Sequence, residues 1–329
     1  MEPTTADFIE HLVQVFDEAR RVLRTDGTLW LNLGDSYATQ ATDGLKAKDL
    51  MGIPWRVALA LQSAGWYLRS DIIWSKNNSM PEAVKDRCTK AHEYIFHFAH
   101  PESKGSYFYD QDAIREKSAE SGFAKQRAKG VNTWDYGRSG LEKSRPGGMS
   151  GKETFQVTGY RNKRSVWKVN NKPYKGAHFA CWPEKLVEPM IKAGSSQHGC
   201  CSACGAPWVR QTANETYRDI SGTRDMNKTQ LNVVRAGWRK RSPQSTTLGW
   251  EPSCKCEADV VPCTVLDPFS GSATTGCVAL QHGRNYIGID LSSEYLPLAL
   301  ARLEGRAAPE AQLEEEPEDG SILDLFQVD

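Results

Sequence analysis

The chain of 329 residues is long enough to bury a full α/β core, and 39% hydrophobic with 25% charged residues is ordinary for a soluble globular protein. No apolar run reaches the length of a membrane span, and the acidic start of the chain lacks the basic and then apolar layout of a signal peptide. We therefore expect a cytoplasmic protein whose nine cysteines stay reduced and serve as metal ligands or core residues.

Apolar periodicity divides the N-terminal part of the chain into alternating helices and strands. Pro54 falls in the first turn of one expected helix, where the backbone N–H that proline lacks has no helical partner. In chain order, the pattern predicts a helix over 8–23, a strand within 26–36, a helix over 53–61, a strand over 66–74, a polar loop over 76–82 and a strand over 92–96. This alternation is typical of an α/β domain.

Charge is segregated along the chain, although the net charge is zero. Residues 121–175 hold 13 Lys and Arg against 3 Asp and Glu, whereas residues 309–329 hold 8 acids and no base. The basic stretch would supply phosphate contacts to a nucleic acid, and Trp134, Tyr136 and Tyr160 would stack on bases or fill a small core. A solvated flexible loop is the alternative. The candidate phosphate contacts are Lys125, Arg127, Lys129, Arg138, Arg161, Lys163 and Arg164.

Two close pairs of cysteines interrupt the C-terminal part of the chain. Cys201 and Cys204 flank two residues and precede Gly205, which is typical of a knuckle turn, and Cys254 and Cys256 flank a single residue. Four thiolates in tetrahedral geometry are a common structural zinc site, so we expect zinc here. Free thiols are the alternative, and His198 or Cys200 would replace one ligand if the set differs. The remaining cysteines Cys88, Cys181, Cys263 and Cys277 are expected to be small buried residues.

The stretch from Val260 to Asp290 has the pattern of a strand, a glycine turn, a helix and a second strand. Val260, Val261, Val265 and Leu266 predict one buried strand, Gly271 allows a sharp turn, and 274–280 predicts a helix whose first amides face a ligand. The second strand, over 285–290, ends in Asp290, which is placed to accept hydrogen bonds from ribose hydroxyls. A structural βαβ turn without a ligand is the alternative.

The amino-acid sequence of this stretch, DPFSGSATTG followed by YIGIDLSSEYLPLALARL, resembles the S-adenosylmethionine site of the amino-group DNA methyltransferases, which modify cytosine N4 or adenine N6. Segment 178–186 resembles the part that closes over the methionine end of the cofactor in that family. The resemblance covers roughly residues 1–110 and 160–305, in the circularly permuted order of the beta class, and implies a Rossmann-like fold. The implied cofactor residues are Asp267, Pro268, Phe269, Gly271, Thr274, Thr275, Asp290, Leu291, Phe179 and Pro183.

The resemblance also implies a pocket for the target base at the carboxyl edge of the sheet. Its candidate residues are Asp35, Ser36, Lys76, Asn77 and His92. Asp35 and Ser36 could instead cap the following helix. Methyl transfer to an amine depends on alignment with the sulfonium methyl, so His92 is expected to orient the polar loop or line the pocket and not to act as a base.

These enzymes carry a Ser/Asp/Asn-Pro-Pro-aromatic loop that contacts the target amine and stacks on the flipped base. No such tetrapeptide occurs in the 329 residues, and 171–174, Asn-Lys-Pro-Tyr, lacks the first proline. We therefore expect that this loop is encoded upstream of Met1 and that the 329 residues contribute no catalytic residue of that kind. We also expect that the chain on its own is inactive and less stable than a version extended to include the loop.

The resemblance implies a site-specific DNA methyltransferase of restriction–modification or phage type, acting on double-stranded DNA, with a slight preference for cytosine over adenine. A cognate restriction endonuclease or an upstream-encoded fragment is an expected partner. A catalytically inactive nucleic-acid-binding relative is the alternative. The expected division is a catalytic-side half (1–110), a basic target-recognition insert (111–165), a cofactor-closing segment (166–194), a cysteine-containing insert (195–262), a cofactor-binding half (263–305) and an acidic tail (306–329).

Overall fold

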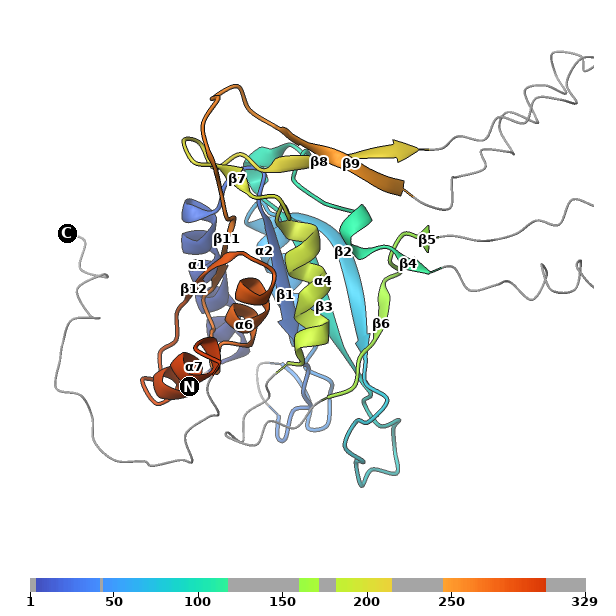
Figure 1. Cartoon of the computed structure of the whole chain (residues 1–329). Helices are drawn as coiled ribbons and strands as arrows, with labels where there is room; N and C mark the ends of the chain where they lie inside the picture. Colours follow the sequence, from blue (N-terminus) through green and yellow to red (C-terminus); the bar gives the residue numbers. More distant parts are fainter. Residues whose placement is uncertain (1–3, 42–43, 118–159, 172–181, 215–244, 306–329) are drawn as a thin grey trace, which may run out of the picture. The chain divides into compact units, whose positions relative to one another are not determined.

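The structure is a computed structural model that describes residues 4–41, 44–117, 160–171, 182–214 and 245–305 (Figure 1). The chain divides into two compact units, each built from three separate segments. Unit 1 comprises Met1–Trp74, Glu93–Trp167 and Pro189–Cys263, and unit 2 comprises Ser75–His92, Lys168–Glu188 and Thr264–Asp329. The division by segments expected from the sequence stays a prediction. Among the described residues, no helix has the length and apolar character needed to cross a membrane.

Unit 1 is built around a four-stranded sheet with the strand order β1-β3-β2-β6 (Figure 1). The strands are β1 (Thr28–Leu33), β2 (Tyr67–Ser75), β3 (His92–Ala99) and β6 (Val166–Lys168). β1 and β3 run antiparallel, with Thr28 opposite Ala99 and Leu33 opposite Tyr94. The helices α1 (Thr5–Val22) and α2 (Ile53–Ser63) confirm the two helices predicted in this part of the chain.

The core of unit 1 lies between these two helices and one face of the sheet. Alternation along β1 and β3 places Leu31, Phe96 and Phe98 on that face, which is how a strand separates its two surfaces. On the other face of the sheet, Trp30 stacks on His97 with ring centroids 4.2 Å apart. The buried core residues are Phe16, Leu31, Val57, Ala58, Leu61, Trp66, Phe96 and Phe98.

Short elements complete unit 1. Arg210 of β8 reaches the buried carboxylate of Asp110 at 2.8 Å and lies over the ring of Trp250 on β9, which fixes the β8–β9 hairpin to the unit. Two-stranded sheets are formed by β4 (Glu116–Lys117) with β5 (Tyr160–Arg161), β7 (Cys200–Cys201) with β10 (Val260–Val261), and β8 (Trp208–Asn214) with β9 (Ser245–Pro252). The 3₁₀ turns are η1 (Pro101–Ser103) and η2 (Asp112–Ile114). Helix α4 (Glu184–Gly194) is shared, because its residues up to Glu188 belong to unit 2 and those from Pro189 belong to unit 1.

Unit 2 contains the predicted βαβ unit. The strands β11 (Thr264–Asp267) and β12 (Asn285–Gly288) are parallel, and the helix α6 (Thr274–Gln281) connects them. A further helix, α7 (Tyr295–Leu303), follows β12 and packs against α6 (Figure 1).

Two expectations about buried residues were wrong. Val260 and Val261 belong to β10, which pairs with β7, and they are 38% and 37% exposed, so they do not continue into the parallel strand that holds Val265 and Leu266. Pro262 separates the two strands and lacks the N–H that a continuous ladder needs. Cys88 is exposed and not a core residue, while Cys181 lies outside the described residues.

Candidate functional site

The turn after β11 is organised by the carboxylate of Asp267. One of its oxygens accepts a hydrogen bond from the backbone N–H of Phe269 at 3.0 Å, and the other accepts from the hydroxyl of Thr275. Burial raises the pKa of Asp267 above its ordinary value, and the nearby Asp290 acts in the same direction, against these two hydrogen bonds. The predicted residues Asp267 and Thr275 therefore belong to one hydrogen-bonded turn.

Asp290, just beyond β12, closes the turn from the other strand. Its Oδ2 accepts a hydrogen bond from the N–H of Gly271 at 2.7 Å, and its Oδ1 accepts from the N–H of Ser292 at 2.9 Å. Asp290 is exposed. Its carboxylate has about four lone-pair positions, and because these two hydrogen bonds use only part of them, it can still accept a hydrogen bond from a ligand hydroxyl. Phe269 and Leu291 are also exposed beside these turns, at 52% and 103%.

Glycine at two positions lets α6 approach β12 closely. A Cβ added to Gly276 would lie 2.5 Å from ring atoms of Tyr286, and one added to Gly288 would lie 2.5 Å from the hydroxyl of the same tyrosine. That hydroxyl is 2.8 Å from the side-chain oxygen of Ser270 in the turn, and burial raises the pKa of Tyr286 to about 12. A larger side chain at either glycine would therefore displace the turn.

Arg302 of α7 holds the start of α6. Its Nη1 donates to the backbone carbonyl of Ser272 at 2.7 Å, to the hydroxyl of Ser272 at 2.8 Å and to the hydroxyl of Thr274 at 3.0 Å. Its Nη2 lies 3.7 Å from Oε1 of Glu184, at the start of α4, and the Arg302 side chain is 13% exposed. This guanidinium places a positive charge at the turn, and Arg302 was not among the residues predicted for the site.

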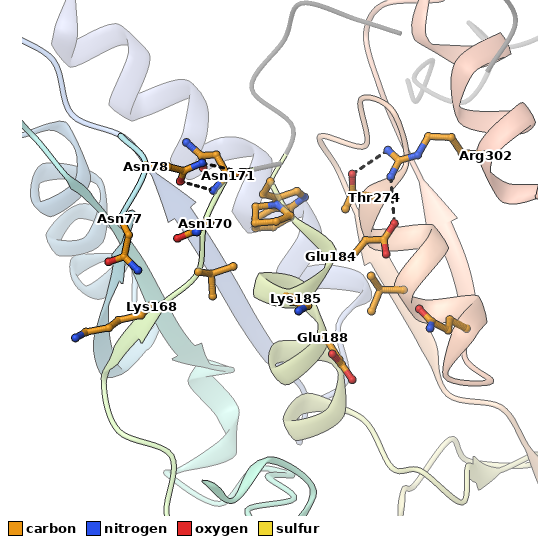
Figure 2. A pocket seen from close by; sticks show the side chains of 15 residues that line it. Asn77, Asn78, Lys168, Asn170, Asn171, Glu184, Lys185, Glu188, Thr274 and Arg302 are labelled. Atoms are coloured by element: carbon orange, nitrogen blue, oxygen red, sulfur yellow. Dashed lines mark hydrogen bonds and ion pairs between the residues drawn. The ribbon is translucent and has the colours of Figure 1, made fainter. Parts of the chain in front are cut away.

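A cavity of about 900 Å³ lies in unit 2 beside this arginine (Figure 2). At one side, the amide of Asn78 donates to the carbonyl of Asn171 and its oxygen accepts from the N–H of Asn171, at 3.0 and 2.9 Å. Among the predicted residues, Asn77, Pro183 and Thr274 line the cavity, whereas Asp267, Gly271 and Asp290 do not. The lining residues are Asn77, Asn78, Lys168, Val169, Asn170, Asn171, Trp182, Pro183, Glu184, Lys185, Glu188, Thr274, Val278, Gln281 and Arg302.

The residues predicted for the target base are divided between the units. Asp35 and Ser36 belong to unit 1, and Lys76, Asn77 and His92 belong to unit 2. Oδ1 of Asp35 accepts from the N–H of Ile53 at 3.1 Å, so this side chain caps the first turn of α2, as the alternative interpretation has it. The backbone N–H of Lys76 donates to the carbonyl of Ala91 at 2.8 Å.

The predicted phosphate contacts Lys125, Arg127, Lys129 and Arg138, and the cofactor residue Phe179, lie outside the described residues. Arg161 and Arg164 both donate to Oε1 of Glu116 at 2.8 Å. Burial acts to raise the pKa of Glu116, but the two guanidinium groups hold it below its ordinary value. Lys163 lies 4.8 Å from the ring centre of Trp167. These three cations thus have local contacts within unit 1.

The four predicted metal ligands come together in unit 1. The ligand atoms of Cys201, Cys204, Cys254 and Cys256 all lie within 4.8 Å of one another. Gly205, with φ of 70°, turns the chain so that its N–H donates to the carbonyl of Cys201 at 2.8 Å. The β8–β9 hairpin brings the second cysteine pair back to the first. Backbone N–H groups, that of Cys204 first, lower the pKa of the Cys201 thiol to about 7.

The fold is that of a mixed α/β protein with a βαβ unit, in which α6 joins the parallel strands β11 and β12. A family model for N6/N4 methyltransferases, described as DNA methylase, matches residues 2–201 and 263–301. The chain therefore belongs to the N6/N4 DNA methylase family, which confirms the resemblance identified from the sequence. The unmatched interval, 202–262, holds the β8–β9 hairpin and three of the four clustered cysteines.

Curated relatives match nearly the whole chain. The Type II methyltransferase M.Cfr9I of Citrobacter freundii is 33% identical over an alignment 326 residues long, which covers 93% of this chain and 74% of that protein. M.XycI of Xanthomonas campestris pv. cyanopsidis is 35% identical over an alignment 327 residues long, which covers 93% of this chain and 74% of that protein. M.SmaI of Serratia marcescens is 31% identical over an alignment 324 residues long, which covers 92% of this chain and 76% of that protein.

Proposed function

We propose that this protein is a site-specific DNA methyltransferase that moves a methyl group from S-adenosylmethionine to the exocyclic amine of cytosine (N4) or adenine (N6). The observation that carries the proposal is the β11–α6–β12 turn, with Asp267 and Asp290 at the ends of two parallel strands, in a chain of the N6/N4 DNA methylase family. The relatives described as Type II methyltransferases support a restriction–modification role.

The residues of unit 2 fit such a cofactor. The exposed carboxylate of Asp290 would accept hydrogen bonds from the ribose hydroxyls, and the ring of Phe269 would offer an apolar surface beside the turn. Asp267 would hold the turn in place through its bonds to Phe269 and Thr275. When bound, S-adenosylmethionine supplies an electrophilic methyl group on a sulfonium. Pro183, a buried residue just before α4, would lie in the segment that closes over the methionine end of the cofactor. This arrangement would be the Rossmann-like fold in its circularly permuted order.

On the target side, the proposal assigns binding roles only. Asn77 lines the cavity of unit 2 and would contact the substrate, with Lys76 and His92 shaping the polar loop. Asp35 and Ser36 of unit 1 remain predicted contacts of the base, and Asp35 also accepts a hydrogen bond from the first turn of α2. The basic segment 111–165 would contact the phosphates of double-stranded DNA. Because the substrate is cellular DNA, the protein would act in the cytoplasm. A cognate restriction endonuclease would be its partner. As the target base, we slightly favour cytosine over adenine.

We also propose that the cysteine cluster of unit 1 binds one structural zinc ion. A tetrahedral site with Zn–S bonds of about 2.3 Å holds its sulfur atoms roughly 3.8 Å apart. The four thiols lie within 4.8 Å of one another, and four sulfur donors are the set that structural zinc prefers. Zinc would join the knuckle turn at Gly205 to the end of the β8–β9 hairpin. The backbone carbonyl of Cys204 also accepts from Arg24, which ties the knuckle to the turn before β1.

A second candidate is a nucleic-acid-binding relative that keeps the cofactor fold without turnover. The observation that favours it is that the 329 residues contain no Ser/Asp/Asn-Pro-Pro-aromatic sequence. Methyl transfer to bacteriophage DNA, read by mass spectrometry of the nucleosides, separates the two. N4-methylcytosine or N6-methyladenine would support the enzyme. Binding of S-adenosylmethionine and DNA without methylated nucleoside would favour the second candidate, and no binding of S-adenosylmethionine would contradict both.

A further inference from the structure

We propose that Arg302 binds the carboxylate at the methionine end of the cofactor, in competition with Glu184. This inference rests on the proposed function, because it names the residue that recognises one end of the proposed ligand. Arg302 lines the cavity of unit 2, and its side chain is 13% exposed, so the guanidinium is largely withdrawn from water but still reaches the cavity (Figure 2).

The guanidinium of Arg302 is held firmly at one of its nitrogens. Nη1 makes three hydrogen bonds, to the carbonyl and hydroxyl of Ser272 and to the hydroxyl of Thr274, within 3.0 Å. Ser272 and Thr274 are both buried, at 6% and 3% exposure, so the partners of Nη1 are fixed. A planar guanidinium held at one nitrogen presents its other nitrogen in a set direction, which suits recognition of a carboxylate.

The other nitrogen of the Arg302 guanidinium faces a carboxylate of the protein itself. Nη2 of Arg302 has the carboxylate of Glu184 at 3.7 Å, beyond the range of a good charge-assisted hydrogen bond, and the Glu184 side chain is 58% exposed. Figure 2 shows Glu184 directed toward Arg302 from the start of α4. A half-exposed ion pair at this distance is weak. A ligand carboxylate that approached Nη2 more closely would therefore replace Glu184 at little cost.

Groups of opposite charge bind the two ends of the turn. Gly271 is bound by the carboxylate of Asp290, whereas Ser272 and Thr274 are bound by the guanidinium of Arg302. The turn thus has an acceptor at one end, suited to ribose hydroxyls, and a cation at the other end, suited to an anion. S-adenosylmethionine has the same polarity, because its ribose and its amino-acid carboxylate lie on opposite sides of the sulfonium.

The test compares S-adenosylmethionine with decarboxylated S-adenosylmethionine, which differs in the carboxylate alone, by calorimetry on the full chain. We expect the unaltered protein to bind the carboxylated ligand roughly 10- to 100-fold more tightly, as for a charge-assisted hydrogen bond. Arg302→Gln should remove most of this preference and leave the affinity for the decarboxylated ligand nearly unchanged. Lys85→Gln, which removes an exposed cation of unit 2 outside the cavity lining, is the matched control and should keep the preference.

Glu184→Gln provides an independent test if Arg302→Gln fails to fold. Removing the competing carboxylate should tighten binding of S-adenosylmethionine by about 2- to 5-fold, the range of a weak surface pair, without affecting the decarboxylated ligand. The proposal is overturned if the unaltered protein binds both ligands equally, or if Arg302→Gln weakens both to the same extent, which would make Arg302 a positioning residue only. If the unaltered protein binds neither ligand, the proposed cofactor itself is wrong and this inference fails with it.

Discussion

The carboxylate of Asp290 accepts a 2.7 Å hydrogen bond from the backbone N–H of Gly271, which joins the end of β12 to the turn that follows β11. The bond crosses between the two parallel strands at the edge where α/β proteins bind nucleotides. This hydrogen bond holds the glycine turn in place before a ligand binds. It also fixes the position of the Asp290 carboxylate, whose remaining lone pairs are available to a ligand. Preorganisation of this kind reduces the entropy that binding would otherwise cost.

Close packing of α6 on β12 predicts a strong effect of a single methyl group. Gly276→Ala would place its Cβ 2.5 Å from the Tyr286 ring, and we expect it to lower the free energy of unfolding by about 1–3 kcal/mol. Urea denaturation followed by circular dichroism measures this. Gly249→Ala, where a Cβ meets nothing within 4 Å, is the control and should change stability by less than about 0.5 kcal/mol. Equal stability of Gly276→Ala and the unaltered protein would refute the packing argument.

The cysteine cluster predicts a metal content. Purified, reduced protein should contain about one zinc per chain, as expected for a closed four-thiolate site. Replacing Cys201 and Cys204 by Ser should abolish the zinc, because two of the four ligands are lost. Cys277→Ser, in α6 of unit 2, should leave the zinc content unchanged. Mass spectrometric metal analysis that finds no zinc in the unaltered protein would exclude the site.

Burial of His97 predicts a pH dependence of stability. Desolvation, with a smaller contribution from Arg69, lowers the pKa of His97 to about 4 from its ordinary value of 6.5. The unfolded chain therefore binds this proton more readily, so the stabilisation is complete above pH 6.5 and is lost as the pH falls toward 4. If this stabilisation were lost completely, the free energy of unfolding would fall by roughly 3 kcal/mol, since each pKa unit corresponds to about 1.36 kcal/mol.

Thermal denaturation between pH 4 and pH 7 checks this contribution of His97. His97→Phe keeps an aromatic ring beside Trp30 but cannot be protonated, so its stability should fall less steeply with decreasing pH. The exposed His11 is the control position, and His11→Phe should keep the slope of the unaltered protein. If His97→Phe and the unaltered protein show parallel pH profiles, His97 is not the group that titrates.

The local signals in the sequence predicted most elements correctly. The apolar periodicity of α1, Pro54 in the first turn of α2, and the glycine turn before α6 each act within a few residues, so they can be recognised without the partner segments. The spacing of the two cysteine pairs was equally local, and the structure places the four thiols together.

The errors and omissions concern partners that are distant in sequence. The apolar character of Val260 and Val261 indicates a strand but not which strand it pairs with, and pairing with β7 separates these residues from β11. Arg302 is a single cation in the apolar helix α7, and its contacts with Ser272 and Thr274 lie nearly 30 residues away, at separations of 30 and 28. A cation on an apolar helix was the available signal, but its partners follow from the tertiary fold alone.

The most direct test of the account is calorimetric titration of S-adenosylmethionine into the unaltered protein and into Asp290→Ala. The account predicts that the unaltered protein binds and that Asp290→Ala loses about 1–3 kcal/mol of binding free energy, because charge-assisted hydrogen bonds to the ribose are removed. Asp259→Ala, an exposed acid of unit 1, should bind as the unaltered protein does. Equal affinity of the unaltered protein and Asp290→Ala would remove Asp290 from the site and contradict the proposed cofactor-binding turn.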